Sequence, residues 1–193
     1  MSGRLGVLLL VSGPSGSGKT SLCQALRDAG EVVYSISCTT RRRREGELDG
    51  EHYHFLSEED FERRVSAGDF LEHAVVHGNR YGTLKGSVLE RLESGTDVAM
   101  DIDVQGAALV RGCEDAVIQR VLVDVFVMPP SMEELEKRLS GRGTESAGEM
   151  EVRLANAAAE MAHAEEYGHR IVSGTREEDY ERLLGVLEEA RVG

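Results

Sequence analysis

Residues 13–20 read Gly-Pro-Ser-Gly-Ser-Gly-Lys-Thr and fit the pattern GxxxxGK[ST] at every fixed position. Glycines at this spacing let the backbone fold tightly enough for successive N–H groups to converge on phosphate oxygens. The lysine of this pattern reaches the β- and γ-phosphates, and the hydroxyl that follows it binds Mg²⁺. The sequence therefore predicts a nucleoside triphosphate site, rather than a glycine turn with an incidental lysine. Its residues are Gly13, Pro14, Ser15, Gly16, Ser17, Gly18, Lys19 and Thr20.

Two carboxylates, Asp101 and Asp103, end an apolar stretch that we predict to be a strand over 96–104. Sheets of parallel strands present their sites at this edge. Carboxylates there could hold Mg²⁺ through water or accept hydrogen bonds from a substrate. They could instead cap a helix that begins near Gln105, and the sequence leaves both interpretations open.

The elements around these residues follow from hydrophobic spacing. The run 6–11 (GVLLLV) is typical of a strand buried on both faces, and the phosphate loop and a helix over 19–29 follow it. We predict further strands at 32–38, 52–56, 71–77, 121–128 and 170–172. We predict four further helices. One starts at Ser57, one runs from Ser131 to about Ser140, a long one ends near Tyr167, and the last runs from Thr175 to about Arg191. This order predicts an α/β fold of the P-loop NTPase type, a parallel sheet with helices on both faces and two excursions from it.

Composition narrows the function classes. The 193 residues suggest one domain with inserts, and 35 acidic against 22 basic residues give a net charge of −13. Such a charge disfavours a general nucleic-acid surface, so an anionic ligand must meet locally gathered cations. The three cysteines form no CxxC pair, and the apolar runs 7–11 and 121–123 are too short to span a bilayer. We therefore expect a cytoplasmic protein without membrane or nucleic-acid partners, and a monomer and a homodimer fit equally well.

Several separated motifs carry a resemblance over nearly the whole chain. They are GPSGSGKT at 13–20, SISCTTR at 35–41, GELDGEHYHF at 46–55, FLEHAVVHGNRYGT at 70–83, DIDVQG at 101–106 and PPSMEELEKRLSGRGTE at 129–145. Together and in this order they resemble the guanylate kinase family. The resemblance implies transfer of the γ-phosphoryl group of ATP to GMP or dGMP. It also implies a GMP-binding α+β insert at 37–95, a core made of 1–36 and 96–193, and a lid at about 140–152. From the phosphate loop and the strand-end carboxylates we expect Thr20 and Asp101 to hold Mg²⁺.

The resemblance also implies roles for single residues. The GMP phosphate would be held by Arg41, Arg44, Tyr53 and Tyr81, and the base would face Ser37, Glu72, Thr83 and Asp103. The transferring group would be neutralised by Lys19, Arg138, Arg142 and Arg153. Residue chemistry agrees, because one carboxylate such as Glu72 can accept both the N1–H and N2–H donors of guanine, whereas adenine lacks this pair.

Other interpretations stay open. By residue type alone, Glu72 could be an exposed strand residue, and 41–44 a solvated basic run. Arg43 stands where the family commonly has proline, and Ser173 where an asparagine commonly faces adenine. The chain could also be a guanylate-kinase-like interaction module without catalysis, or a kinase of the same fold that phosphorylates a ribose bisphosphate.

Overall fold

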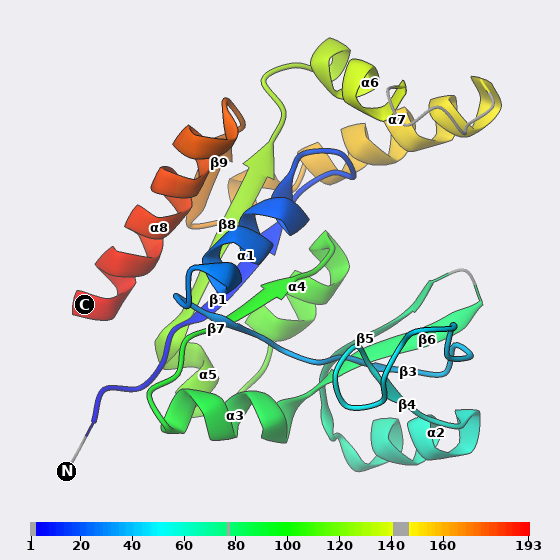
Figure 1. The fold of residues 1–193 in the computed structure, drawn as a ribbon, viewed down its shortest axis with the longest axis vertical. Coiled ribbons are helices and arrows are strands. Elements are labelled where there is room, and N and C mark those ends of the chain that lie inside the picture. The colour runs from blue at the N-terminus through cyan, green and yellow to red at the C-terminus, as the bar shows by residue number, and fades with distance from the viewer. Residues whose placement is uncertain (1–2, 77, 141–146) are drawn as a thin grey trace.

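A computed structural model describes residues 3–76, 78–140 and 147–193, and a five-stranded parallel sheet forms its centre (Figure 1). The strands are β1 (Leu8–Ser12), β2 (Val33–Tyr34), β7 (Val98–Asp101), β8 (Leu122–Met128) and β9 (His169–Val172). Their spatial order is β2-β7-β1-β8-β9, and all neighbours run parallel. All five residues of β1 are buried, as its continuous apolar run predicts.

Helices cover both faces of this sheet. On one face, α1 (Lys19–Asp28) and α8 (Arg176–Val192) bury Leu22 and Leu183 against Leu9 of β1. On the other face, α3 (Lys85–Glu93), α4 (Val104–Arg111) and α5 (Ala116–Val121) pack on alternate residues of the same strands. The predicted α/β fold with a parallel sheet between two helical layers is confirmed.

A second, four-stranded sheet stands to one side of the first (Figure 1). Its strands are β3 (Cys38–Thr39), β4 (His54–Phe55), β5 (Phe70–Val76) and β6 (Asn79–Leu84), in the order β4-β3-β6-β5. The helix α2 (Glu58–Ala67) covers it, with the Phe61 ring stacked on Phe70 at 4.5 Å between centroids. The range 37–95 therefore supplies this sheet, while α3 from the same range packs on the first sheet.

Helix starts follow the predicted caps. The Ser57 hydroxyl accepts a hydrogen bond from the Asp60 amide at 3.0 Å, and Ser131 accepts from the Glu134 amide at 3.1 Å. Thr175 and Glu178 form the complete reciprocal pair at the start of α8. These starts are set by residues within one helical turn, which is why sequence alone locates them.

Three predicted elements are wrong in extent. The strand expected over 96–104 is β7, which ends at Asp101, because Asp103 caps α4 and the helix begins at Val104. The expected strand over 32–38 is two strands in different sheets, β2 and β3, joined by an extended link. The chain crosses here from one sheet to the other, so no single ladder can pair the whole run. The helix expected to reach Tyr167 is α7 (Ala147–Met161), followed by a 3-10 turn at Ala164–Glu166, while α6 (Met132–Ser140) ends as predicted.

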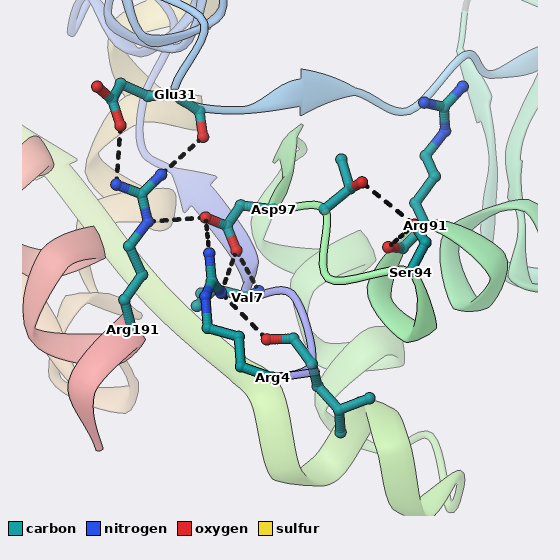
Figure 2. A network of polar contacts seen from close by, with 9 residues as sticks. Arg4, Val7, Glu31, Arg91, Ser94, Asp97 and Arg191 are labelled. Carbon is teal, nitrogen blue, oxygen red and sulfur yellow. Dashed lines mark hydrogen bonds and ion pairs between the residues drawn. The ribbon is translucent and has the colours of Figure 1, made fainter. Parts of the chain in front are cut away.

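The buried carboxylate of Asp97 links three separate segments of the chain. It lies at the amino-terminal end of the parallel strands, away from the phosphate loop. Asp97, just before β7, accepts hydrogen bonds from Arg4 at 2.8 and 3.0 Å, from the Val7 amide at 2.7 Å and from Arg191 Nε at 2.8 Å (Figure 2). Arg191 also binds Glu31 at 2.8 Å. One carboxylate thus links the segment before β1, the start of β7 and the end of α8.

All three thiols are free, with Cys23 and Cys38 buried and Cys113 half-buried. Across the described part of the chain, no helix is both long and apolar enough to cross a bilayer.

Candidate active site

The glycine-rich loop joins β1 to α1 in the tight path that phosphate binding requires. Gly13 has φ 143°, and a Cβ there would lie 2.1 Å from the Val127 carbonyl oxygen. Gly16 has φ 88°, and its Cβ would meet Leu139 of α6 at 3.0 Å. A side chain at either place is excluded by both strain and contact, so the loop keeps its backbone free for an anion. Lys19 opens α1, with its Nζ 3.4 Å from the Pro14 carbonyl oxygen.

Thr20 and Asp101 meet beside this loop. The Thr20 hydroxyl donates a hydrogen bond to the Asp101 carboxylate, which ends β7 next to β1. A hydroxyl and a carboxylate are the oxygen ligands that Mg²⁺ prefers, so this pair fits the ion. No group of three or more His, Cys, Asp or Glu side chains able to hold a metal occurs among the described residues. With Thr20 and Asp101 as its protein ligands, Mg²⁺ would complete its coordination with phosphate and water oxygens.

A cavity of about 400 Å³ opens between the two sheets next to this pair. Its lining includes Thr20, Tyr34, Ser37, Tyr53, Thr83 and Asp101. Residues predicted for the triphosphate end and residues predicted for the acceptor thus border one space, although they are far apart in the sequence.

Glu72 is buried at the inner side of the second sheet, with 9% of its surface exposed. Its Oε1 accepts the Thr83 hydroxyl at 2.7 Å, because the two residues are register partners on β5 and β6. Burial raises the pKa of Glu72, the Thr83 hydrogen bond opposes this shift and Asp103 adds to it. The interpretation of Glu72 as an exposed strand residue is therefore wrong.

Gly106 leaves the room between Glu72 and Asp103. A Cβ at this position would lie 3.6 Å from Glu72 Oε2 and 3.4 Å from Asp103 Oδ1. Asp103 also caps α4, with its Oδ1 accepting the Gly106 amide at 2.7 Å. The capping alternative thus holds for Asp103, whereas Asp101 faces Thr20. Glu72 and Asp103 both lie beside Gly106, where a planar donor pair could reach them.

Glu47 organises the basic turn at 41–44. Its Oε1 pairs with Arg41 at 2.7 Å, and its Oε2 accepts the Arg44 amide at 2.7 Å. The hydrogen bond from Arg41, with that from the Arg44 amide, lowers the pKa of Glu47 to about 2. The Arg41 guanidinium also lies 5.4 Å from the centre of the Tyr53 ring, which meets Tyr81 edge-on at 6.0 Å.

The structure therefore gathers Arg41, Tyr53 and Tyr81, while residues 42–44 are exposed. The solvated-run interpretation fits those three arginines and not Arg41, whose side chain is 14% exposed.

Two of the three arginines predicted to face the transferring group lie on described helices, Arg138 on α6 and Arg153 on α7. Arg138 of α6 donates from Nε to Glu134 at 3.2 Å and from Nη1 to the Ser173 hydroxyl at 3.0 Å. Its neighbour Leu139 contacts Gly16 of the phosphate loop. Arg153 is half-buried on α7. Arg142 and much of the lid predicted at about 140–152 lie outside the described residues.

The sequence does not single out three acidic residues that lie near the predicted site residues. They are Glu47, Asp179 and Glu160. Glu47 had a local signal, since it follows Arg44 by three residues within a turn. Asp179 had none, because an acid in the first turn of a helix is common. Glu160 of α7 has its pKa raised by burial, an effect that Lys19 opposes and Asp103 reinforces, so this carboxylate lies within electrostatic range of both.

Known proteins are similar to this chain in sequence and in fold. The sequence profile of the family described as guanylate kinase matches residues 6–190. The guanylate kinase of Clostridium perfringens strain 13 is 41% identical over 184 residues, covering 94% of this chain and 82% of the relative. That of Sulfurimonas denitrificans is 43% identical over 194 residues, covering 100% and 92%. The crystal structure of guanylate kinase from Anaplasma phagocytophilum superposes with a TM-score of 0.73 at 33% identity, covering 99% of this chain and 89% of that one.

Proposed function

Since the chain belongs to the guanylate kinase family, we infer that it transfers the γ-phosphoryl group of ATP to GMP, giving ADP and GDP. The observation that carries the choice of acceptor is the buried Glu72 carboxylate paired with Thr83. Guanine offers two adjacent donors to such a carboxylate, whereas adenine lacks this pair and would leave the buried carboxylate with the Thr83 hydrogen bond alone.

At the donor end, residues 13–20 bind the triphosphate of ATP through backbone amides and the start of α1. Lys19 supplies positive charge to the transferring phosphate. Its Nζ lies within the phosphate loop, 3.4 Å from the Pro14 carbonyl oxygen. Bound Mg²⁺ would neutralise phosphate charge, and Thr20 and Asp101 are the residues that would hold it. Neither residue needs to accept a proton in this reaction.

At the acceptor end, Arg41, Arg44, Tyr53 and Tyr81 bind the GMP phosphate, and Ser37, Glu72, Thr83 and Asp103 bind guanine. The pairing of Arg41 with Glu47 and the two tyrosine rings beside it support the first assignment. The nearness of Glu72 and Asp103 to Gly106 supports the second. The GMP phosphate is itself the anionic nucleophile, so no general base is assigned.

Arg138, Arg142 and Arg153 neutralise the group in transfer. Contact of α6 with Gly16 supports this role for Arg138. Preorganised cations act where charge spreads over the transferring oxygens, and exclusion of water strengthens them. We assign residues 37–95 to the acceptor-binding insert, 1–36 and 96–193 to the core, and about 140–152 to a lid that closes over the nucleotides.

ATP and GMP are the expected partners, without nucleic acid or membrane. The net charge of −13 disfavours contact with a polyanion outside the cleft. Three free cysteines fit a reducing compartment, so we assign the protein to the cytoplasm.

A panel of acceptors tests the function. Purified protein with ATP and Mg²⁺ is offered GMP, dGMP, AMP and a ribose bisphosphate at equal concentrations, and ADP release is measured. GMP or dGMP should be turned over at least about 10³-fold faster than AMP, since a buried carboxylate without its partners is costly. Preference for the ribose bisphosphate would identify the other kinase, and absence of GDP a non-catalytic module.

A further inference from the structure

A buried carboxylate outside the proposed machinery organises the link between β9 and α8. Asp179, in the first turn of α8, has a side chain that is 6% exposed. Its Oδ2 accepts the Ser173 hydroxyl at 2.9 Å, and its Oδ1 accepts the Gly174 amide at 2.8 Å. A carboxylate has only acceptors to offer, so the single proton of Ser173 points towards Asp179.

The orientation of Ser173 determines what it offers to Arg138. With its proton given to Asp179, the hydroxyl oxygen has lone pairs free to accept, and Arg138 Nη1 donates to it at 3.0 Å. Hydrogen bonds in such a chain polarise one another, which strengthens the acceptor that faces the guanidinium. Arg138 Nε is held by Glu134 as well. Two nitrogens of one guanidinium are therefore fixed, one from its own helix and one from the far end of β9.

These contacts lie at the end of the main sheet that carries the phosphate loop. α6 and the start of α8 lie at the same end of the main sheet (Figure 1), and α6 contacts the phosphate loop at Gly16. Ser173 is itself buried, with 5% of its surface exposed. An arginine held from two sides needs less reorganisation when charge develops nearby.

Building on the proposed function, in which Arg138 neutralises the transferring group, we propose that Ser173 and Asp179 are positioning residues that hold Arg138 in its working orientation. They act through Arg138, to which the Ser173 hydroxyl is hydrogen-bonded, although Ser173 stands where the family commonly has an asparagine that faces adenine. Their removal lowers kcat rather than raising the KM for GMP, because the hydrogen bonds of Ser173 and Asp179 go to Arg138, to each other and to the Gly174 amide, none of which is assigned to GMP.

Ser173→Ala tests the proposal directly. The variant removes one hydroxyl from the chain, and kcat should fall about tenfold while the KM for GMP and the KM for ATP each change less than about twofold. A KM for ATP that rises while kcat holds would mean that Ser173 serves the adenine, and it would overturn the proposal. Ser173→Thr keeps the hydroxyl and should restore most of kcat. Asp179→Asn keeps the shape of the carboxylate without its charge, and it should lower kcat in the same way. It serves as the second variant if Ser173→Ala folds poorly.

Thr175→Ala is the matched control from the same link. Thr175 caps α8 by accepting the Glu178 amide at 3.2 Å, and it has no contact with Arg138. Loss of the cap should lower the melting temperature by roughly 2–4 °C with kcat unchanged. Equal losses of kcat in Ser173→Ala and Thr175→Ala would mean that Ser173 merely supports the fold, which overturns the proposal.

A double-mutant cycle completes the test. In an Arg138→Ala background, Ser173→Ala should cause no further loss, because the residue through which it acts is gone. The same loss in both backgrounds would overturn the proposal. Normal GMP turnover by the wild type with unchanged kcat in Ser173→Ala overturns this proposal alone. Absence of GMP turnover by the wild type overturns the proposed function and the positioning role together.

Discussion

The charge of Lys19 is expected to act mainly on the chemical step. Its Nζ is held near the Pro14 carbonyl inside the phosphate loop, with no carboxylate paired to it among the described residues. Lys19→Met should lower kcat by on the order of 10³-fold or more, because a preorganised cation at the transferring phosphate is lost. The matched control is Lys137→Met, which removes the same charge from an exposed pair with Glu133 on α6. Wild-type turnover in a folded Lys19→Met variant would contradict the assignment.

Glu72 is expected to discriminate between the two substrates. In Glu72→Gln the amide accepts one guanine donor and opposes the second, so the KM for GMP should rise roughly 10²-fold while the KM for ATP changes little. Glu59→Gln, on the exposed surface of α2, controls for removal of an acid from the same part of the chain. Steady-state kinetics with each substrate varied in turn separate these effects. Equal losses for both nucleotides would mean that Glu72 supports the fold rather than the base.

The pH dependence of GMP binding follows from the same carboxylate. Burial raises the pKa of Glu72, so this group takes up a proton at a higher pH than an exposed glutamate. The ionised form binds guanine, and the affinity for GMP is therefore lost as the pH falls through the raised pKa. Measured from pH 8 to pH 5, the KM for GMP should rise in the wild type. The Glu72-dependent part of this rise should be absent in Glu72→Gln.

At the scale of elements, the turn at 41–47 depends on Glu47. The Glu47 carboxylate accepts hydrogen bonds from the Arg41 side chain and from the Arg44 backbone amide. These contacts restrict a turn in which Arg43 replaces the proline that the family commonly has. Glu47→Gln should raise the KM for GMP several-fold with a smaller change in kcat, because the phosphate-binding turn loses its brace.

The control is Glu45→Gln, since Glu45 is exposed two residues earlier and makes no hydrogen bond or ion pair within the described ranges. A KM for GMP that rises equally in both variants would contradict the bracing role. With the pKa of Glu47 at about 2, the brace is present at ordinary pH and is lost only as the pH falls towards that value.

Elements set by local signals were predictable, and those set by distant partners were not. Ser57, Ser131 and Thr175 marked helix starts because a cap and its amide lie in one turn. The strand β6 is not predicted, because its residues, which include Gly82, have a weak strand pattern. It forms because it pairs with both β5 and β3. The helix α5 has only six residues, too few for a periodicity to show. The crossing from β2 to β3 depends on two sheets that the local sequence does not reveal.

In the candidate site, too, local features could be predicted from the sequence, whereas contacts between distant segments could not. The phosphate loop is one continuous segment, so its spacing alone predicts its geometry. The contact of Glu72 with Thr83 depends on the β5–β6 register, and the contact of Thr20 with Asp101 depends on β1 lying beside β7. The chain from Asp179 through Ser173 to Arg138 joins three separate segments, and no spacing in the sequence indicates it.

At the scale of the whole molecule, Asp97 is expected to determine stability without affecting catalysis. Burial acts to raise the pKa of Asp97, but hydrogen bonds from Arg4, the Val7 amide and Arg191 outweigh it and lower the pKa. Asp97→Asn should reduce the free energy of unfolding by about 2–3 kcal/mol, because two arginines lose their buried partner. Turnover by the folded variant should be unchanged, since Asp97 precedes β7 and the site lies beyond its far end.

Urea unfolding measures this change, and Asp28→Asn is the control. Asp28 pairs with Arg27 at 2.8 Å but is 68% exposed, so its loss should cost less than about 0.5 kcal/mol. The Asp97 contribution is present above the pKa of an unfolded aspartate and is lost as the pH falls through the lowered folded value. Similar losses in the two variants would contradict a special role for the buried group.

The same carboxylate bears on how the protein matures during synthesis. Arg191 is translated 94 residues after Asp97, and α8, which covers one face of the main sheet, leaves the ribosome with it. Until then, of the two arginines that bind Asp97, Arg4 alone has been made, and the β1 face that α8 covers lacks that cover. The nascent chain therefore cannot complete its core until α8 has left the exit tunnel.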